Sequence, residues 1–78
     1  MVYLNKRTEK ALTQMTLAGA PIGTCQKWSG SVDGINATYI PSFTQPLKPG
    51  DERRAAVFFG SVSFVIHVRS YNGALSVA

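Results

Sequence analysis

The side chains that could carry out covalent or acid–base chemistry are few and widely spaced in this sequence. It contains one cysteine, Cys25, and one histidine, His67. Nucleophilic catalysis needs a nucleophile, a base and an orienting group within hydrogen-bond reach, and nothing in the sequence requires these two residues to meet. We interpret Cys25 as a partly buried thiol and His67 as a histidine on the surface of a sheet.

The remaining titratable residues do not suggest a catalytic or metal centre either. Asp33 is predicted to form a turn, and Asp51 and Glu52 are adjacent at the end of a loop, so an acid–base pair has little support. A metal centre would need more than one histidine, and a single cysteine excludes a cysteine-based zinc site. The glycine patterns of phosphate-binding loops are absent. We therefore expect a protein that is not an enzyme and that has no metal and no cofactor.

Binding chemistry is a better match to the C-terminal third of the chain. Single-stranded nucleic acid is commonly held on a sheet, where aromatic rings stack on bases and Arg or Lys contact phosphates. Phe58 and Tyr71 could stack, and Arg54, His67 and Arg69 could supply positive charge. The outlying members of this candidate site are Lys27, Lys48 and Arg53. The sequence therefore predicts a site for single-stranded DNA or RNA.

A protein partner is the alternative, because any two-faced sheet with an arginine and a tyrosine offers similar chemistry. The sheet is predicted to end in Ala74 to Ala78, a strand with no Lys or Pro to protect its open edge. Such an edge can pair with a copy of itself or with a strand of another protein. The chain would then be a stoichiometric inhibitor, an adaptor or a self-assembling structural component, with an exposed apolar patch.

Three antiparallel strands are predicted in residues 53–78, joined by tight turns at Gly60 with Ser61 and at Asn72 with Gly73. Counting pairs outward from these turns sorts the residues into two faces. The apolar face, expected to form the core, holds Ala55, Val57, Phe59, Val62, Phe64, Ile66, Val68, Leu75 and Val77. The mixed face holds Arg54, Ala56, Phe58, Ser63, Val65, His67, Arg69, Tyr71, Ala74 and Ser76. Either a second layer covers the mixed face, or it is exposed and binds a ligand. The alternative to this register is a single long strand with a glycine bulge in place of the Gly60 turn.

A helix is predicted at the N-terminus, capped by Asn5 and ending near Ala18, with Gly19 as its stop signal. Its apolar stripe comprises Ala11, Leu12, Met15 and Ala18. Its first turns carry Lys6, Arg7 and Lys10. The helix dipole disfavours positive charge there. These cations either form a solvated surface at a small energetic cost or meet an anionic partner.

The first hairpin is predicted from residues 26–32 and 35–40, closed by Asp33 and Gly34 in a type I′ turn. This turn pairs Val32 with Ile35, Gly30 with Ala37 and Trp28 with Tyr39. Opposed residues share a face, so the hairpin has one apolar side and one polar side.

A proline-rich crossing loop is predicted over residues 41–52. Phe43 and Leu47 are expected to pin it to the core. A loop of this length in so small a protein is a frequent place for function or a partner contact.

Length and composition set the limits of the fold. A chain of 78 residues with 45% hydrophobic and 15% charged residues fits a single small globular domain spanning residues 1–78. We predict an α+β fold in which the N-terminal helix packs on a five-stranded antiparallel β-meander. A core this thin favours a homo-oligomer.

The overall charge is mildly basic. Eight Lys and Arg against four Asp and Glu give a net charge of +4 and an isoelectric point near 9.7, which is compatible with phosphate partners. The basic residues near the N-terminus have no apolar run after them, and the longest apolar stretch is too short to cross a bilayer. We therefore expect a cytoplasmic protein without membrane association.

Overall fold

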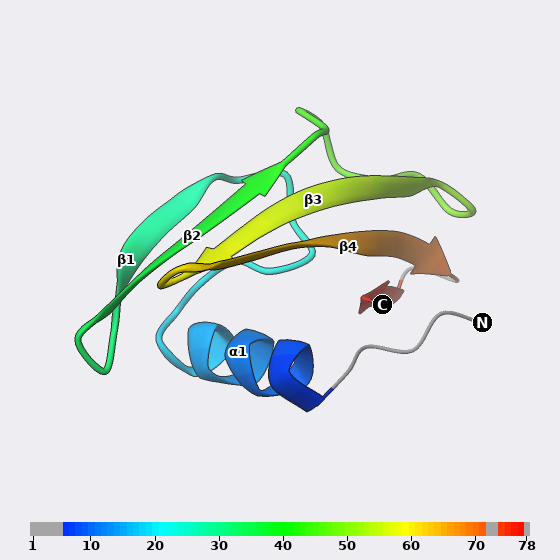
Figure 1. The fold of residues 1–78 in the computed structure, drawn as a ribbon. Coiled ribbons are helices and arrows are strands. Elements are labelled where there is room, and N and C mark those ends of the chain that lie inside the picture. The colour runs from blue at the N-terminus through cyan, green and yellow to red at the C-terminus, as the bar shows by residue number, and fades with distance from the viewer. Residues whose placement is uncertain (1–5, 72–73, 78) are drawn as a thin grey trace.

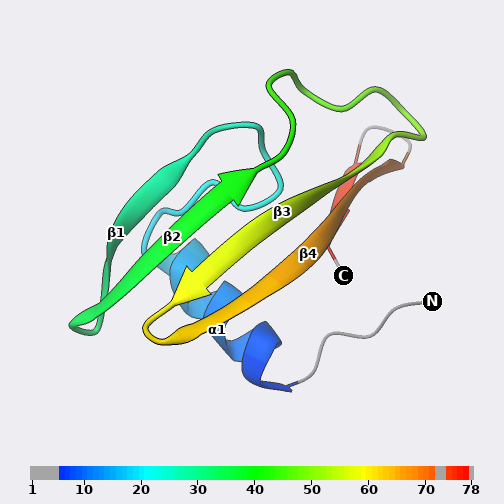
Figure 2. The ribbon, with the colours of Figure 1, turned by 45° about the horizontal axis from the view of Figure 1, so that its top comes forward.

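The fold consists of one helix against one face of an antiparallel sheet, as Figures 1 and 2 show. The computed structural model describes residues 6–71 and 74–77, with side chains described for residues 6–70. The elements are α1 (Lys6–Leu17), β1 (Trp28–Val32), β2 (Ile35–Pro41), β3 (Glu52–Phe59), β4 (Val62–Tyr71) and β5 (Ala74–Val77). Neighbours along the chain are neighbours in the sheet, so the topology is a meander.

The predicted number of strands, five, is wrong. The sheet that α1 covers is four-stranded, formed by β1 to β4, which contain between five and ten residues each. The last segment, β5, is a four-residue piece that pairs with the outer edge of β4. β5 is shorter than each of β1 to β4. The predicted turn at Asn72 and Gly73 lies outside the described residues.

The C-terminal end of α1 follows the predicted stop signal. Gly19 has a positive φ of 99°, which glycine adopts without steric cost. The amide of Gly19 donates to the carbonyl of Thr16, and the amide of Ala20 donates to the carbonyl of Met15. This pair of hydrogen bonds is a Schellman motif, which satisfies carbonyls that the end of a helix leaves without partners. The proposed cap, Asn5, lies outside the described residues.

The buried stripe of α1 differs from the predicted one at its end. Ala11, Leu12 and Met15 are buried against the sheet as expected, together with Thr8. Ala18 is exposed, because α1 ends at Leu17 and the chain turns away at Gly19. The stripe therefore runs from Thr8 to Met15 rather than from Ala11 to Ala18.

The first hairpin has the predicted register. Asp33 and Gly34 have φ values of 51° and 77°, as a type I′ turn requires. The pairs are Val32 with Ile35, Gly30 with Ala37 and Trp28 with Tyr39. β1 begins two residues later than predicted, at Trp28.

Gly60 and Ser61 form a true turn, so the rival register with a long bulged strand is wrong. Of the two turn residues, only Gly60 has a positive φ, 62°, which fits a type II′ turn. The pairs outward from this turn are Phe59 with Val62, Val57 with Phe64 and Ala55 with Ile66, as predicted.

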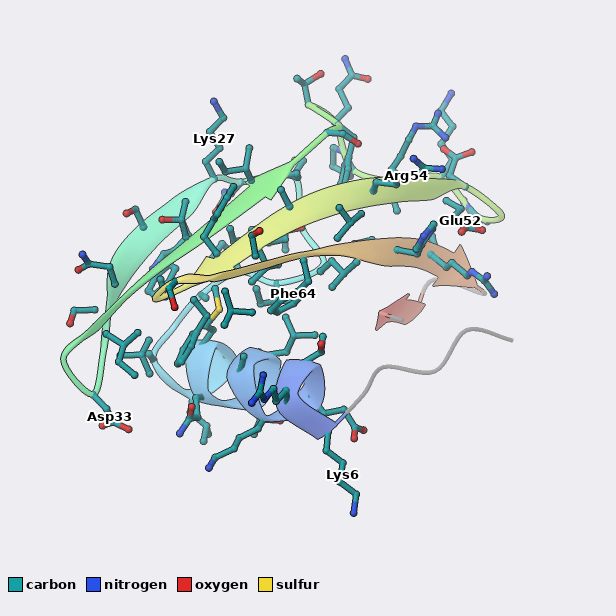
Figure 3. The ribbon with its side chains drawn as sticks, viewed as in Figure 1. Lys6, Lys27, Asp33, Glu52, Arg54 and Phe64 are labelled. Carbon is teal, nitrogen blue, oxygen red and sulfur yellow. The ribbon has the colours of Figure 1, made fainter. Side chains whose placement is uncertain are left out.

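The covered face of the sheet, the one against α1, forms the core. Tyr39, Val57, Ile66 and Val68 are fully buried there, together with Met15 of the helix. Figure 3 shows Phe64 pointing into the space between the sheet and α1.

Two residues expected in the core are only partly covered. Ile35 and Val62 are 38% and 45% exposed. Both residues lie next to a hairpin turn, at the end of the sheet, and both line the space between α1 and the sheet.

The crossing loop is shorter than predicted, because Pro41 ends β2 and Glu52 begins β3. Its ends continue the sheet pairing: the amide of Ser42 donates to the carbonyl of Arg54, and the amide of Gly50 donates to the carbonyl of Ser70. Phe43 is buried and Leu47 packs against the core, as expected.

Tyr39 connects the sheet to the segment that precedes it. Its side chain is 0% exposed, and its hydroxyl donates a hydrogen bond of 2.6 Å to the carbonyl of Thr24. Burial raises the pKa of the Tyr39 phenol above its usual 10.0. The buried ring and its hydrogen bond fix the connection between α1 and β1 on the sheet.

We expect Tyr39→Phe to lower the free energy of unfolding by about 1 kcal/mol at neutral pH, because it removes one hydrogen bond and keeps the ring. Above pH 10.0 the wild-type phenol ionises more readily in the unfolded chain than in the folded one. The folded state then binds more protons, and its stability falls as the pH rises. Urea denaturation of both proteins should show their difference shrinking above pH 10.0; a difference independent of pH would contradict this account.

Candidate functional site

The face of the sheet opposite α1, here called the open face, carries four of the predicted binding residues: Arg54, Phe58, His67 and Arg69. Residues opposed across a ladder share a face, and the pairings of β1 to β4 define it without ambiguity. It consists of Ser29, Ser31, Asn36, Thr38, Ile40, Glu52, Arg54, Ala56, Phe58, Ser63, Val65, His67 and Arg69. No element in the described part of the chain packs over it (Figure 1).

One end of the open face holds a charged cluster of Glu52, Arg54, His67 and Arg69. In the register, Glu52 faces Arg69 and Arg54 faces His67. Glu52 Oε1 lies 3.0 Å from His67 Nδ1, and Glu52 Oε2 lies 3.1 Å from Arg69 Nε. A single carboxylate therefore contacts two of the predicted binding residues at once.

Glu52 is the member of the charged cluster that the sequence interpretation missed. The sequence prediction places it at the end of the crossing loop, whereas it is the first residue of β3. The sequence contains the signal for this position. Counting pairs outward from the Gly60 turn places Arg53 opposite Val68, and the next pair places Glu52 opposite Arg69. The two Arg charges and one Glu charge leave the cluster at about +1 with His67 neutral, which is less positive than predicted.

Next to the charged cluster lies an apolar band, formed by Ile40, Ala56, Val65 and Phe58. Ile40, Ala56 and Val65 stand side by side in one row across β2, β3 and β4. Val65 is 58% exposed and Ile40 is also exposed. Large apolar side chains that are exposed together on one surface are a common feature of contact sites.

Phe58 is the aromatic member of the open face. It lies in the next row, between Thr38 of β2 and Ser63 of β4, and is 41% exposed. The two flanking side chains are small and polar, so the ring has room beside it on both sides.

Lys27 adds positive charge at the opposite edge of the open face. It is exposed and immediately precedes Trp28, which pairs with Tyr39, so its backbone lies beside the row that contains Ile40. Figure 3 shows Lys27 and Arg54 both pointing away from α1. Three strand spacings of about 4.8 Å separate β1 from β4, or about 14 Å in all. Cations thus stand at both sides of the apolar band.

Three other predicted residues do not join this group. Arg53 belongs to the other face of β3, because it pairs with Val68. Lys48 lies in a turn of the crossing loop, where its amide donates to Asp51 Oδ2. The side chain of Tyr71 lies outside the described residues, so the second predicted stacking ring stays a prediction.

The cysteine and the histidine lie on opposite sides of the sheet. Cys25 is partly buried in the connection between α1 and β1 and packs against the core. His67 points to the open face from β4. Among the described residues there is no group of three or more His, Cys, Asp and Glu side chains that could hold a metal ion. Within the same residues, no helix has the length and hydropathy to cross a membrane.

Comparison with known proteins adds nothing to this geometry. No protein-family model, no curated protein and no solved structure matches the chain. A function can therefore be proposed only from the chemistry and arrangement of the residues themselves.

The exposure of the open face predicts different costs for two neighbouring substitutions in β4. Ile66 is 0% exposed, and Ile66→Ala should lower the free energy of unfolding by about 2–5 kcal/mol. Val65→Ala, on the open face, should cost at most about 1 kcal/mol, the range of β-propensity differences. Denaturant unfolding of both variants measures this. A cost for Val65→Ala as large as that for Ile66→Ala would mean that another layer covers the open face.

Proposed function

We propose that this protein binds single-stranded nucleic acid on the open face of its sheet. The observation that supports the proposal is Phe58, an exposed ring on an uncovered sheet face that also carries Arg54 and Arg69 at one end and has Lys27 at its β1 edge. Sheets that bind single strands combine an aromatic stacking surface with cations along the backbone path in this way.

In this proposal the nucleic-acid strand crosses the sheet from β1 toward β4. A base stacks on Phe58, and neighbouring bases contact Ile40 and Val65, whose exposed side chains are apolar. Phosphates approach Lys27 at the β1 edge, and Arg54 on β3 and Arg69 on β4 at the other end of the path. Because stacking and phosphate contacts carry little sequence information, binding should be tolerant of sequence.

Glu52 has a defined part in this proposal. Its contact holds the Arg69 side chain in place but offsets part of the positive charge that attracts phosphate. A phosphate that approached Arg69 would compete with the carboxylate for the same guanidinium group. The affinity should consequently be moderate and strongly dependent on salt.

A protein partner, or a second copy of the chain, is the second candidate. The apolar band favours it, since Ile40, Phe58 and Val65 expose apolar surface that nucleic acid would use only in part. If the partner is a second copy, the open face is covered in solution and Val65→Ala is costly. Self-association and nucleic-acid binding therefore differ in the unfolding measurement described above as well as in binding.

Replacing the stacking ring is the first test. Phe58→Ala should weaken binding of a fluorescent oligothymidylate by about 5- to 150-fold, because stacking on one base contributes about 1–3 kcal/mol. Fluorescence anisotropy at several salt concentrations measures the change. The slope of log affinity against log salt concentration should be unchanged in Phe58→Ala. In Arg54→Ala the slope should become shallower by the amount that corresponds to about one phosphate contact. Equal affinities of Phe58→Ala and the wild type would exclude this site.

Removing the carboxylate gives a test with the opposite sign. Glu52→Gln should strengthen oligonucleotide binding by roughly fivefold at low salt, because it frees Arg69 and His67 and removes one negative charge. Asp33→Asn is the matched control: it removes the same charge at the tip of the first hairpin (Figure 3), where asparagine also tolerates the positive φ. An equal gain in both variants would show a general charge effect and would argue against a site at the charged cluster.

A further inference from the structure

A cleft lies between α1 and the covered side of the sheet, close to the hairpin ends. Its volume is about 510 Å³, within the range of small-molecule sites. It opens between the first half of α1 and the turn that joins β3 to β4. It is separated from the open face by the sheet itself, so the proposed nucleic-acid site does not account for it.

The two walls of this cleft differ in chemistry. The sheet contributes the apolar side chains Ile35, Phe59, Val62 and Phe64. The helix contributes two cations, Arg7 and Lys10, with Thr8, Ala11 and Gln14. Among the described residues that line the cleft there is no carboxylate. The cleft is thus apolar on one side and positively charged on the other.

The partial exposure of Val62 and Ile35 makes this wall available to a ligand. A fully packed core would bury both residues, yet each remains more than one-third exposed. Phe59 and Phe64 are partly buried at the edge of the core and form the base of the cleft. Covering these four side chains with an apolar molecule would remove more apolar area from water.

The two cations of α1 lie where a bound anion would be favoured. Arg7 and Lys10 lie in the first turns of the helix, where the helix dipole disfavours positive charge and favours an anion. Among the described residues, neither forms an ion pair with a carboxylate. An anion bound beside them would be attracted both by the two side chains and by the helix terminus.

We propose that this cleft binds a small anionic amphiphile, namely a molecule with an aliphatic body and one carboxylate. The aliphatic body packs on Val62, Phe59 and Phe64. The carboxylate points toward the helix, where the Arg7 guanidinium can donate two parallel hydrogen bonds to it. The charge complementarity favours this ligand over a neutral one, and the volume of the cleft, about 510 Å³, suits a small molecule.

The test uses sodium decanoate below its micelle concentration, with decan-1-ol as the matched neutral molecule. A titration followed by ¹H–¹⁵N NMR should shift the amides of Val62, Ser63 and Phe64 most. Decanol should bind at least about fivefold more weakly, and Arg7→Gln and Lys10→Gln should each weaken decanoate binding by about fivefold, as expected for the loss of one charge contact.

Lys6→Gln is the matched control variant. It makes the same charge change on the same helix, but Lys6 points away from the sheet (Figure 3) and does not line the cleft. It should leave decanoate binding unchanged. Three outcomes would overturn the proposal: equal binding of decanol and decanoate, an effect of Lys6→Gln as large as that of Lys10→Gln, or a dimer in which a second copy fills the cleft and excludes decanoate.

Discussion

A single twelve-residue helix covers one face of this sheet, and the side chains of every strand alternate between that face and the other. In each strand, every second side chain therefore points toward the helix and forms the core. The side chains between them point away from the helix. The chain places Tyr39, Val57 and Ile66 in the core. It places Phe58 and Val65 on the other side, so that two large apolar side chains remain in contact with water. The proposed function follows from this division of the sheet.

Electrostatics decides what the open face can bind. Exposed ion pairs contribute little to stability, about 0–1 kcal/mol, so the contacts of Glu52 with His67 and Arg69 are not needed to hold the fold. Their main effect is on the surface: they contact one arginine and lower the positive charge of the charged cluster. Arg54 and Lys27 extend away from α1 and leave the open face with a moderate positive charge.

Much of this division could be predicted from the sequence, because turn residues fix the register of hairpins. Asp33 with Gly34 and Gly60 with Ser61 set the pairs in two hairpins, and the faces follow by counting. The number of full strands, the start of β3 at Glu52 and the exposure of Val62 could not be predicted in the same way. Strand ends depend on where the loop stops pairing, and exposure depends on how far a helix reaches across the sheet. These are properties of the packed molecule rather than of local sequence.

The central claim is that the open face, and not the helix side, is the surface that contacts single-stranded nucleic acid. The most direct measurement is NMR mapping of backbone amide shifts during titration with an oligothymidylate at low salt. The account predicts that the largest shifts fall on Arg54 to Phe58 of β3 and on Ser63 to Arg69 of β4, and that added salt reverses them. Shifts confined to α1, or no shifts at all, would contradict it.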